Sequence, residues 1–232
     1  MAKRDISANK ASFWDERVMQ FFLSLRPPQT LPRGFAWLHP QIQNETRNVM
    51  QQFFSKYYHD NEQRVLLLGI NPGRFGAGIT GINFTAPRQL NEYCHIAHSL
   101  GNGSELSAEF IYDMINAGGG PEWFFKRCYI GSVCPLGLTK DGKNINYYDD
   151  SSLLAAIFPF VENCVIEQSG WPVPKDKLIC IGGEKNYRFL MQLNQKWNWF
   201  EKIVPLPHPR FIMQYRRKQK ASYIEQYLQA LG

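Results

Sequence analysis

The chain has 232 residues, of which 44% are apolar and 14% aromatic, and Lys and Arg outnumber Asp and Glu by 26 to 20. This length and composition suit one globular domain with a large core and exclude an intrinsically disordered chain. The polar start of the sequence lacks the apolar core of a signal peptide, and no apolar run approaches the roughly 20 residues of a membrane helix. We therefore expect no membrane partner.

Cysteine usage limits the metal chemistry that the chain can support. The five cysteines form neither a CxxC pair nor a close Cys/His cluster. This scatter argues against a zinc deaminase and against an iron–sulfur cluster. It predicts reduced, mostly buried thiols in a cytoplasm-like compartment.

The first elements in chain order are two helices. Apolar residues at near-helical spacing predict an amphipathic helix over 11–25, which the prolines at 27–28 end. The segment TLPRGFAWLHP at 30–40 reads as a loop, and a second helix is predicted near 41–58.

A buried strand and a glycine-rich loop follow. Residues 65–70 are uniformly apolar and stop at Asn71-Pro72-Gly73, which is turn chemistry. The loop that follows carries Arg74 as its one ionisable residue up to Phe84. Open α/β sheets bind ligands at such a loop, beyond the carboxyl end of a parallel strand. We therefore expect the chemistry to begin at Asn71.

The rest of the chain alternates helices and strands. Because strands that alternate with helices form parallel sheets with helices on both faces, the sequence predicts an α/β fold. The carboxyl ends of its strands share one edge, so Asn71, Ser132 and His208 can converge there. The predicted helices lie at 88–100, 105–117, 150–168, 184–196 and about 214–231, and the predicted strands at 128–133, 177–182 and 202–206.

One motif points to a different function. GAGITG at 76–81 matches the dinucleotide pattern G-x-G-x-x-G, but it starts six residues past the strand and does not open a long helix. The match is therefore weak. It leaves a nucleotide-binding α/β protein as an alternative interpretation.

Three residues each have a structural and a functional interpretation. Asn71 can simply form the turn, or its amide can hold a water molecule. Phe84 can belong to the core, or its ring can stack on a flat heterocycle. His208, held between two prolines, can be a structural residue, or as a neutral imidazole it can donate to charge that develops on a leaving group.

Positive charge gathers just after His208. The segment from Arg210 to Lys220 contains five basic residues, counting both ends, and no acid. Clustered positive charge beside a candidate site favours a phosphate-backbone partner.

The stretch GINPGRFGAGITGINF at 69–84, together with the distant His208-Pro209-Arg210, resembles the uracil-DNA glycosylase superfamily. The specific similarity is to the single-strand-selective monofunctional uracil-DNA glycosylases, whose first motif reads G-M-N-P-G-P-F-G-M-x-Q-T-G-V-P-F. FAWLHP at 35–40 and FFKRCYIGSVCPLGL at 124–138 resemble further family segments.

The resemblance implies a three-layer α/β/α sandwich with a four-stranded parallel sheet, in one domain over 1–232 whose N-terminal helices at about 11–60 pack on the core. It implies hydrolysis of the N-glycosidic bond of uracil, and of C5-modified or other deaminated bases, without metal or cofactor. The implied partner is single- or double-stranded DNA that contains such bases, bound by a monomer. The implied location is the nucleoid of a bacterium or the nucleus of a eukaryote.

The resemblance also implies roles for individual residues. Asn71 would hold the water that attacks C1′ of a flipped nucleotide, and His208 would hydrogen-bond the uracil O2. Phe84 would stack on the base, and Gly73 would leave space beside its C5 position. The implied base pocket consists of Ile70, Gly73, Phe75, Phe84 and Ser132.

Two departures from the family pattern stand out. Ser132 replaces an Asn whose amide reads the base edge in the family, which predicts looser base selectivity. The family loop H-P-S-P-R, which wedges into the duplex, is shortened here to residues 208–210. The expected DNA contacts are Arg210 and Phe211 as replacement wedge residues and Arg216, Arg217 and Lys218 on phosphates. A non-catalytic DNA binder of the same fold is a further alternative.

Overall fold

The computed structural model describes residues 12–232. Its α-helices are α1 (Trp14–Ser24), α2 (Asn44–Tyr58), α3 (Ala77–Thr80), α4 (Pro87–Glu92), α5 (Leu106–Gly118), α6 (Pro121–Arg127), α7 (Ser151–Ser169), α8 (Gly183–Trp197), α9 (Pro209–Tyr215) and α10 (Lys220–Leu231). Its strands are β1 (Phe35–Leu38), β2 (Val65–Gly69), β3 (Cys128–Ser132), β4 (Gly137–Lys140), β5 (Lys143–Asn144), β6 (Leu178–Ile181) and β7 (Ile203–Leu206). Two short 3-10 helices cover Pro40–Ile42 and Arg217–Gln219.

Four strands form the parallel central sheet, in the order β3-β2-β6-β7. The predicted four-stranded parallel sheet is confirmed. The apolar runs that predicted these strands are buried: Leu66, Leu67 and Leu68 are fully enclosed, as is most of β6. The pairing places Gly69 opposite Ser132, so β2 and β3 end side by side. The loops that leave their carboxyl ends therefore meet at one edge.

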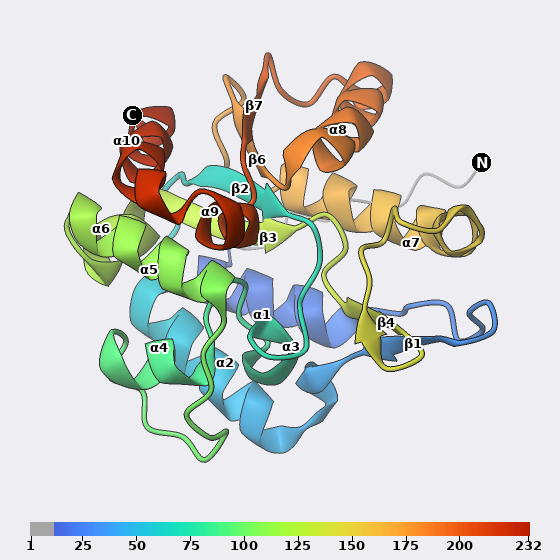
Figure 1. The fold of residues 1–232 in the computed structure, drawn as a ribbon, viewed down its shortest axis with the longest axis horizontal. Helices are drawn as coiled ribbons and strands as arrows, with labels where there is room; N and C mark the ends of the chain where they lie inside the picture. Colours follow the sequence, from blue (N-terminus) through green and yellow to red (C-terminus); the bar gives the residue numbers. More distant parts are fainter. Residues whose placement is uncertain (1–11) are drawn as a thin grey trace.

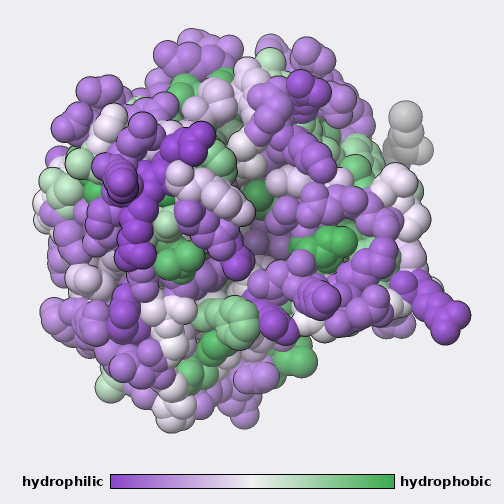
Figure 2. Space-filling view, in the orientation of Figure 1, coloured by the Kyte–Doolittle hydropathy of each residue, from purple (hydrophilic) through white to green (hydrophobic). Residues whose placement is uncertain are grey.

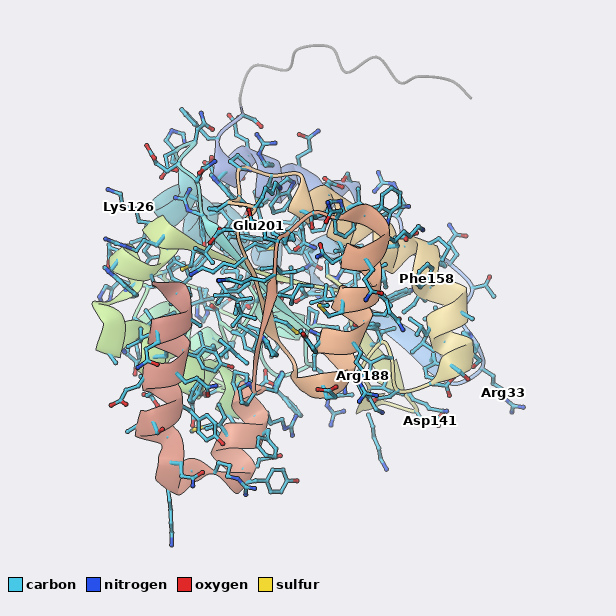
Figure 3. All side chains as sticks on the ribbon, turned by 90° about the horizontal axis from the view of Figure 1, so that it is seen from above. Arg33, Lys126, Asp141, Phe158, Arg188 and Glu201 are labelled. Carbon is cyan, nitrogen blue, oxygen red and sulfur yellow. The ribbon has the colours of Figure 1, made fainter. Side chains whose placement is uncertain are left out.

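Helices cover both faces of the sheet and make three layers (Figure 1). The view from above separates them clearly: Lys126 of α6 lies on one side of the sheet with α10, and Phe158 of α7 and Arg188 of α8 lie on the other (Figure 3). Helices α1 and α2 pack against each other and against the β3 edge. No helix within residues 12–232 is both long and apolar enough to cross a bilayer.

A buried arginine ties the N-terminal helices to this core. Arg64 is completely enclosed and forms a two-pronged ion pair with Asp60, with distances of 2.7 and 2.8 Å. Its Nε donates to the carbonyl of Phe125, and its guanidinium stacks over the rings of Trp14 and Tyr58. Because every polar edge is satisfied, the charge is tolerated in the interior.

A small antiparallel sheet, β1-β4-β5, was missed by the sequence interpretation. The prediction of a loop over 30–40 is wrong for β1, which pairs with β4 across more than a hundred positions, Phe35 opposite Lys140. β1 is apolar but only four residues long and partly exposed, and β5 consists of two exposed residues, so neither differs from a loop in its local pattern. Only the distant partner makes them strands.

Two helix predictions are also corrected. The helix predicted at 88–100 ends at Glu92, and His95 follows with a left-handed φ of 53°. The helix predicted at about 214–231 is broken: α9 ends at Tyr215 and α10 begins at Lys220. Pro209 at the first position of α9 and the side chain of His208 at its N-cap start a separate short helix.

Candidate active site

A cavity of about 110 Å³ opens at the carboxyl edge of β2 and β3. It lies on the face shown in Figure 2, which is hollowed near its centre. The loops after β2, β3 and β7 meet there, as the topology predicts. The lining consists of Ile70, Asn71, Pro72, Gly73, Ala77, Asn83, Phe84, Glu105, Ser107, Ser132, Asn144, Ile145, Asn146, His208 and Arg210.

The amide of Asn71 is held in one orientation by the loop before α7. Its Nδ2 donates to the carbonyls of Ile145 at 3.2 Å and Pro72 at 3.4 Å, and its Oδ1 accepts from the backbone N–H of Tyr147 at 3.0 Å. Both amide hydrogens are therefore used. A carbonyl oxygen has two lone pairs, so Oδ1 can still accept one hydrogen bond, for example from a water molecule.

The ring of His208 is half-buried and electrically neutral. Burial, assisted by the positive charge of Arg210, lowers the pKa of His208 from 6.5 to about 4. The backbone N–H of Arg210 donates to Nδ1 at 3.1 Å, so the proton of the neutral ring sits on Nε2. Nε2 has no partner within the described part of the chain and is free to donate to a ligand.

Phe84 stands between β2 and His208. Its ring centroid is 5.9 Å from that of His208, and it covers Gly69 so closely that a Cβ there would lie 2.9 Å from the ring. Its backbone has a left-handed φ of 54°, which is uncommon for a bulky residue. The surrounding packing therefore fixes a strained loop so that this ring forms one wall of the cavity.

Ser132 is not alone at the end of β3. It is 2% exposed, and its Oγ donates to Oδ1 of Asn83 at 2.7 Å. Nδ2 of Asn83 donates to the carbonyl of Ile130 at 3.2 Å. Asn83 thus brings an amide into the cavity beside Ser132, and the sequence interpretation did not single it out.

Glu105 is a second residue that was not foreseen. It lines the cavity beside Gly73, where an added Cβ would lie 3.1 Å from its Oε1. Burial raises the pKa of the Glu105 carboxyl above its ordinary value, and the charge of Arg210 partly opposes that shift. No pattern in the sequence separates this glutamate from a surface acid before a helix.

Four of the five residues expected to form the base pocket lie around this cavity. Ile70, Gly73, Phe84 and Ser132 line the cavity together with the two predicted catalytic side chains. Phe75 does not: its ring is 53% exposed and lies under the guanidinium of Arg74. The structure therefore does not place Phe75 in the cavity.

Two of the predicted DNA contacts, Arg210 and Phe211, lie at the cavity or in the groove beside it. Arg210 lines the cavity, and a neighbouring groove continues over Phe211 and Tyr215, whose rings are 5.6 Å apart. Arg216 lies over the ring of Phe211. Arg217 and Lys218 are exposed in the 3-10 turn that follows, rather than on a helix as predicted.

Comparison with known proteins decides the family. The family model described as "Uracil DNA glycosylase superfamily" matches residues 55–232. The chain belongs to this superfamily. The crystal structure of wild-type SMUG2 from Pedobacter heparinus superposes with a TM-score of 0.90 at 43% identity, over 94% of this chain and 96% of that one.

A curated relative supports the same assignment over a shorter segment. The single-strand selective monofunctional uracil DNA glycosylase of Bos taurus is 29% identical in an alignment of 106 residues, and the match covers 38% of this chain and 39% of that protein. This match therefore spans less than half of the relative's length. The family and the fold expected from the glycine-rich motif are confirmed.

Proposed function

We propose that this member of the superfamily is a monofunctional DNA glycosylase that hydrolyses the N-glycosidic bond of uracil and leaves an abasic site. One observation carries the proposal: Asn71, Phe84 and His208, from loops far apart in sequence, line one cavity at the sheet edge. A glycosylase must extrude its base and offer a stacking surface and edge contacts in return. These residues supply the surface, a water acceptor and a donor.

In the proposed reaction, Oδ1 of Asn71 accepts a hydrogen bond from a water molecule, since the other polar positions of the amide are engaged. The water oxygen bonds to C1′ and loses a proton to solvent, while the bond from C1′ to N1 breaks and its electron pair leaves with the base. Nε2–H of His208 donates to O2 of the departing uracil anion. A preorganised donor of this kind contributes about 3 kcal/mol to such a step.

The proposal extends to uracils with a substituent at C5. Gly73 contributes no side chain to its part of the cavity, and the carboxyl of Glu105 lies beyond it. A hydroxyl group carried at C5 could therefore donate a hydrogen bond to the Glu105 carboxyl. A methyl group at C5 has no donor and would leave that carboxyl without a partner. We expect faster release of 5-hydroxymethyluracil than of thymine, and the preference should shrink in Glu105→Ala.

The DNA partner is proposed to be single- or double-stranded and bound by a monomer. The groove over Phe211 and Tyr215 offers stacking surfaces, and Arg216, Arg217 and Lys218 offer charge for phosphates. Bases and phosphates next to the flipped nucleotide would follow this groove away from the cavity.

A single assay tests the proposal. The protein is incubated with an oligonucleotide that contains one uracil, and half of the sample is treated with alkali. Strand cleavage only after alkali is expected, because no lysine within residues 12–232 lines the cavity to carry out a lyase step. DNA binding without base release would instead support a non-catalytic binder, and tight binding of free nucleotides would support the nucleotide-binding alternative.

A further inference from the structure

Two departures from the family motif touch each other. Asn83 occupies the position where the motif G-V-P-F has its proline, and Ser132 occupies the position where the family has an asparagine in the central strand. They are 49 positions apart in sequence, yet the hydroxyl of Ser132 donates to Oδ1 of Asn83 at 2.7 Å. The amide missing from β3 is thus present in the same cavity, carried by the opposite loop.

The hydrogen bonds of Asn83 leave one donor and one acceptor unused. Its Nδ2 has two hydrogens, one of which goes to the carbonyl of Ile130, and its Oδ1 has two lone pairs, one of which is taken by Ser132. The described residues supply no partner for the remaining hydrogen and lone pair. Uracil presents the matching pair on its Watson–Crick edge, the N3–H donor and the O4 acceptor.

The orientation of this amide is fixed by its surroundings. The carbonyl of Ser132 accepts from Nε2 of Gln168 at 3.0 Å, so the end of β3 is held from the opposite side. On the loop, the next residue, Phe84, is locked between Gly69 and His208. Because a carbonyl can only accept, the carbonyl of Ile130 fixes the nitrogen end of the Asn83 amide, and the Ser132 hydroxyl donates to the oxygen end and holds it in place.

We propose that Asn83 reads the Watson–Crick edge of the flipped base and that Ser132 is the positioning residue that orients its amide. The inference rests on the proposed function, and it names the determinant of base selectivity within that site. Cytosine presents an acceptor at N3 and a donor at its amino group. The Asn83 amide is held with its oxygen toward N3 and its nitrogen toward the group at C4. It therefore rejects cytosine, because two acceptors would face each other at N3 and two donors at the amino group. The proposal therefore predicts selection of uracil over cytosine by Asn83 and Ser132 together, whereas Ser132 considered alone predicts looser base selectivity.

The test compares two substrates rather than one. Single-turnover rates are measured on oligonucleotides with uracil and with 3-methyluracil, which lacks the N3–H. We expect the wild-type protein to release uracil about 10- to 100-fold faster than 3-methyluracil, the range for one buried hydrogen bond. In Asn83→Ala the uracil rate should fall by a similar factor, and the ratio of the two rates should collapse toward one.

Ser132 is tested through rescue. Ser132→Ala should reduce the ratio because the amide can rotate, and Ser132→Thr, which keeps the hydroxyl, should restore it. The exchange Asn83→Pro with Ser132→Asn recreates the family arrangement. Asn83→Pro alone should lose the discrimination, and the double variant should regain it. Thermal unfolding of each variant identifies those that fail to fold.

The outcomes separate this inference from the function beneath it. If Asn83→Ala slows both substrates equally and keeps their ratio, the amide only supports the loop, and the assignment is overturned. If the wild-type protein releases no uracil, the proposed glycosylase function fails first. Loss of the ratio in Asn83→Ala together with its recovery in the exchanged double variant would support both residues.

Discussion

The backbone N–H of Arg210 donates to Nδ1 of His208, and this one hydrogen bond sets the tautomer of the ring. His208 is also the N-cap residue of α9, and this hydrogen bond is the cap. The start of the helix and the protonation of the imidazole therefore depend on each other. Protonation of Nδ1 would break the cap. The fold therefore favours the neutral ring with its proton on Nε2, the form that can donate to a departing uracil.

The ring of His208 should stay neutral well below the ordinary histidine range. Burial and the charge of Arg210 lower its pKa to about 4. In a titration followed by ¹⁵N NMR, we expect Nδ1 unprotonated and Nε2 protonated at pH 7, with a midpoint near 4. Base release should show no step around the ordinary histidine pKa of about 6.5. A midpoint between pH 6 and 7 would contradict the assignment.

The same shift makes stability depend on pH. Because the folded pKa lies below the unfolded value of 6.5, the folded state binds fewer protons between these values. The contribution is complete above pH 6.5 and is lost as pH falls toward 4, and it amounts to at most about 3 kcal/mol. Urea denaturation at several pH values should show a shallower decline for His208→Gln than for the wild-type protein over this window. Identical slopes would refute the shift.

Replacement of Asn71 should remove chemistry and spare binding. Asn71→Ala deletes the acceptor for the attacking water, and we expect the single-turnover rate on uracil to fall by about 10²- to 10⁴-fold, the range for a positioned proton-transfer or water-holding group. Affinity for uracil DNA should change little. Asn163→Ala is the matched control, since that exposed asparagine on α7 lies outside the cavity. A comparable loss in the control would point to general instability.

The sequence was most informative where one segment carries its own signal. The run at 65–70 is buried because it is continuously apolar, and turn residues end it at Asn71. Parallel topology then placed the ends of β2, β3 and β7 on one edge, which brought His208 to the same cavity. These steps need only local patterns and one rule of topology.

Features that depend on distant partners could not be predicted in this way. Asn83 lies inside the glycine-rich motif, but its place in the site depends on the hydrogen bond from Ser132, and no local sequence pattern indicates that contact. The pairing of Phe35 with Lys140 has the same cause. Phe75 matches the family motif, yet its direction is decided by the path of the loop before α3, and the ring faces solvent.

The two phenylalanines of the glycine-rich loop provide a matched pair. Phe84→Ala removes a cavity wall and should slow release of uracil by about 10- to 100-fold, because stacking on a base is worth about 1–3 kcal/mol. Phe75→Ala removes a ring that is 53% exposed and should change the rate by about twofold or less, as is usual for surface substitutions. Rates and melting temperatures are measured for both variants. Equal losses would return Phe75 to the pocket.

Arg210 should matter more on duplex DNA than on a single strand. It stands at the cavity mouth, in the segment that resembles a longer wedge loop of the family, and the exposed ring of Phe211 follows it. A base in a duplex must be unpaired and replaced before it can enter the cavity, whereas a base in a single strand needs no replacement. We therefore expect Arg210→Ala to lower the rate on duplex uracil by about 10-fold more than on the single strand.

The control for this comparison is Lys126→Ala. Lys126 is exposed on α6, and Figure 3 shows it at the opposite end of the molecule from α9. Lys126→Ala removes one positive charge, as Arg210→Ala does, but leaves the cavity unchanged, so it measures the general loss of attraction to phosphates. Added salt should weaken DNA binding by both variants alike. If Arg210→Ala reduces both rates by the same factor, the side chain acts through charge on phosphates, and the wedge assignment is wrong.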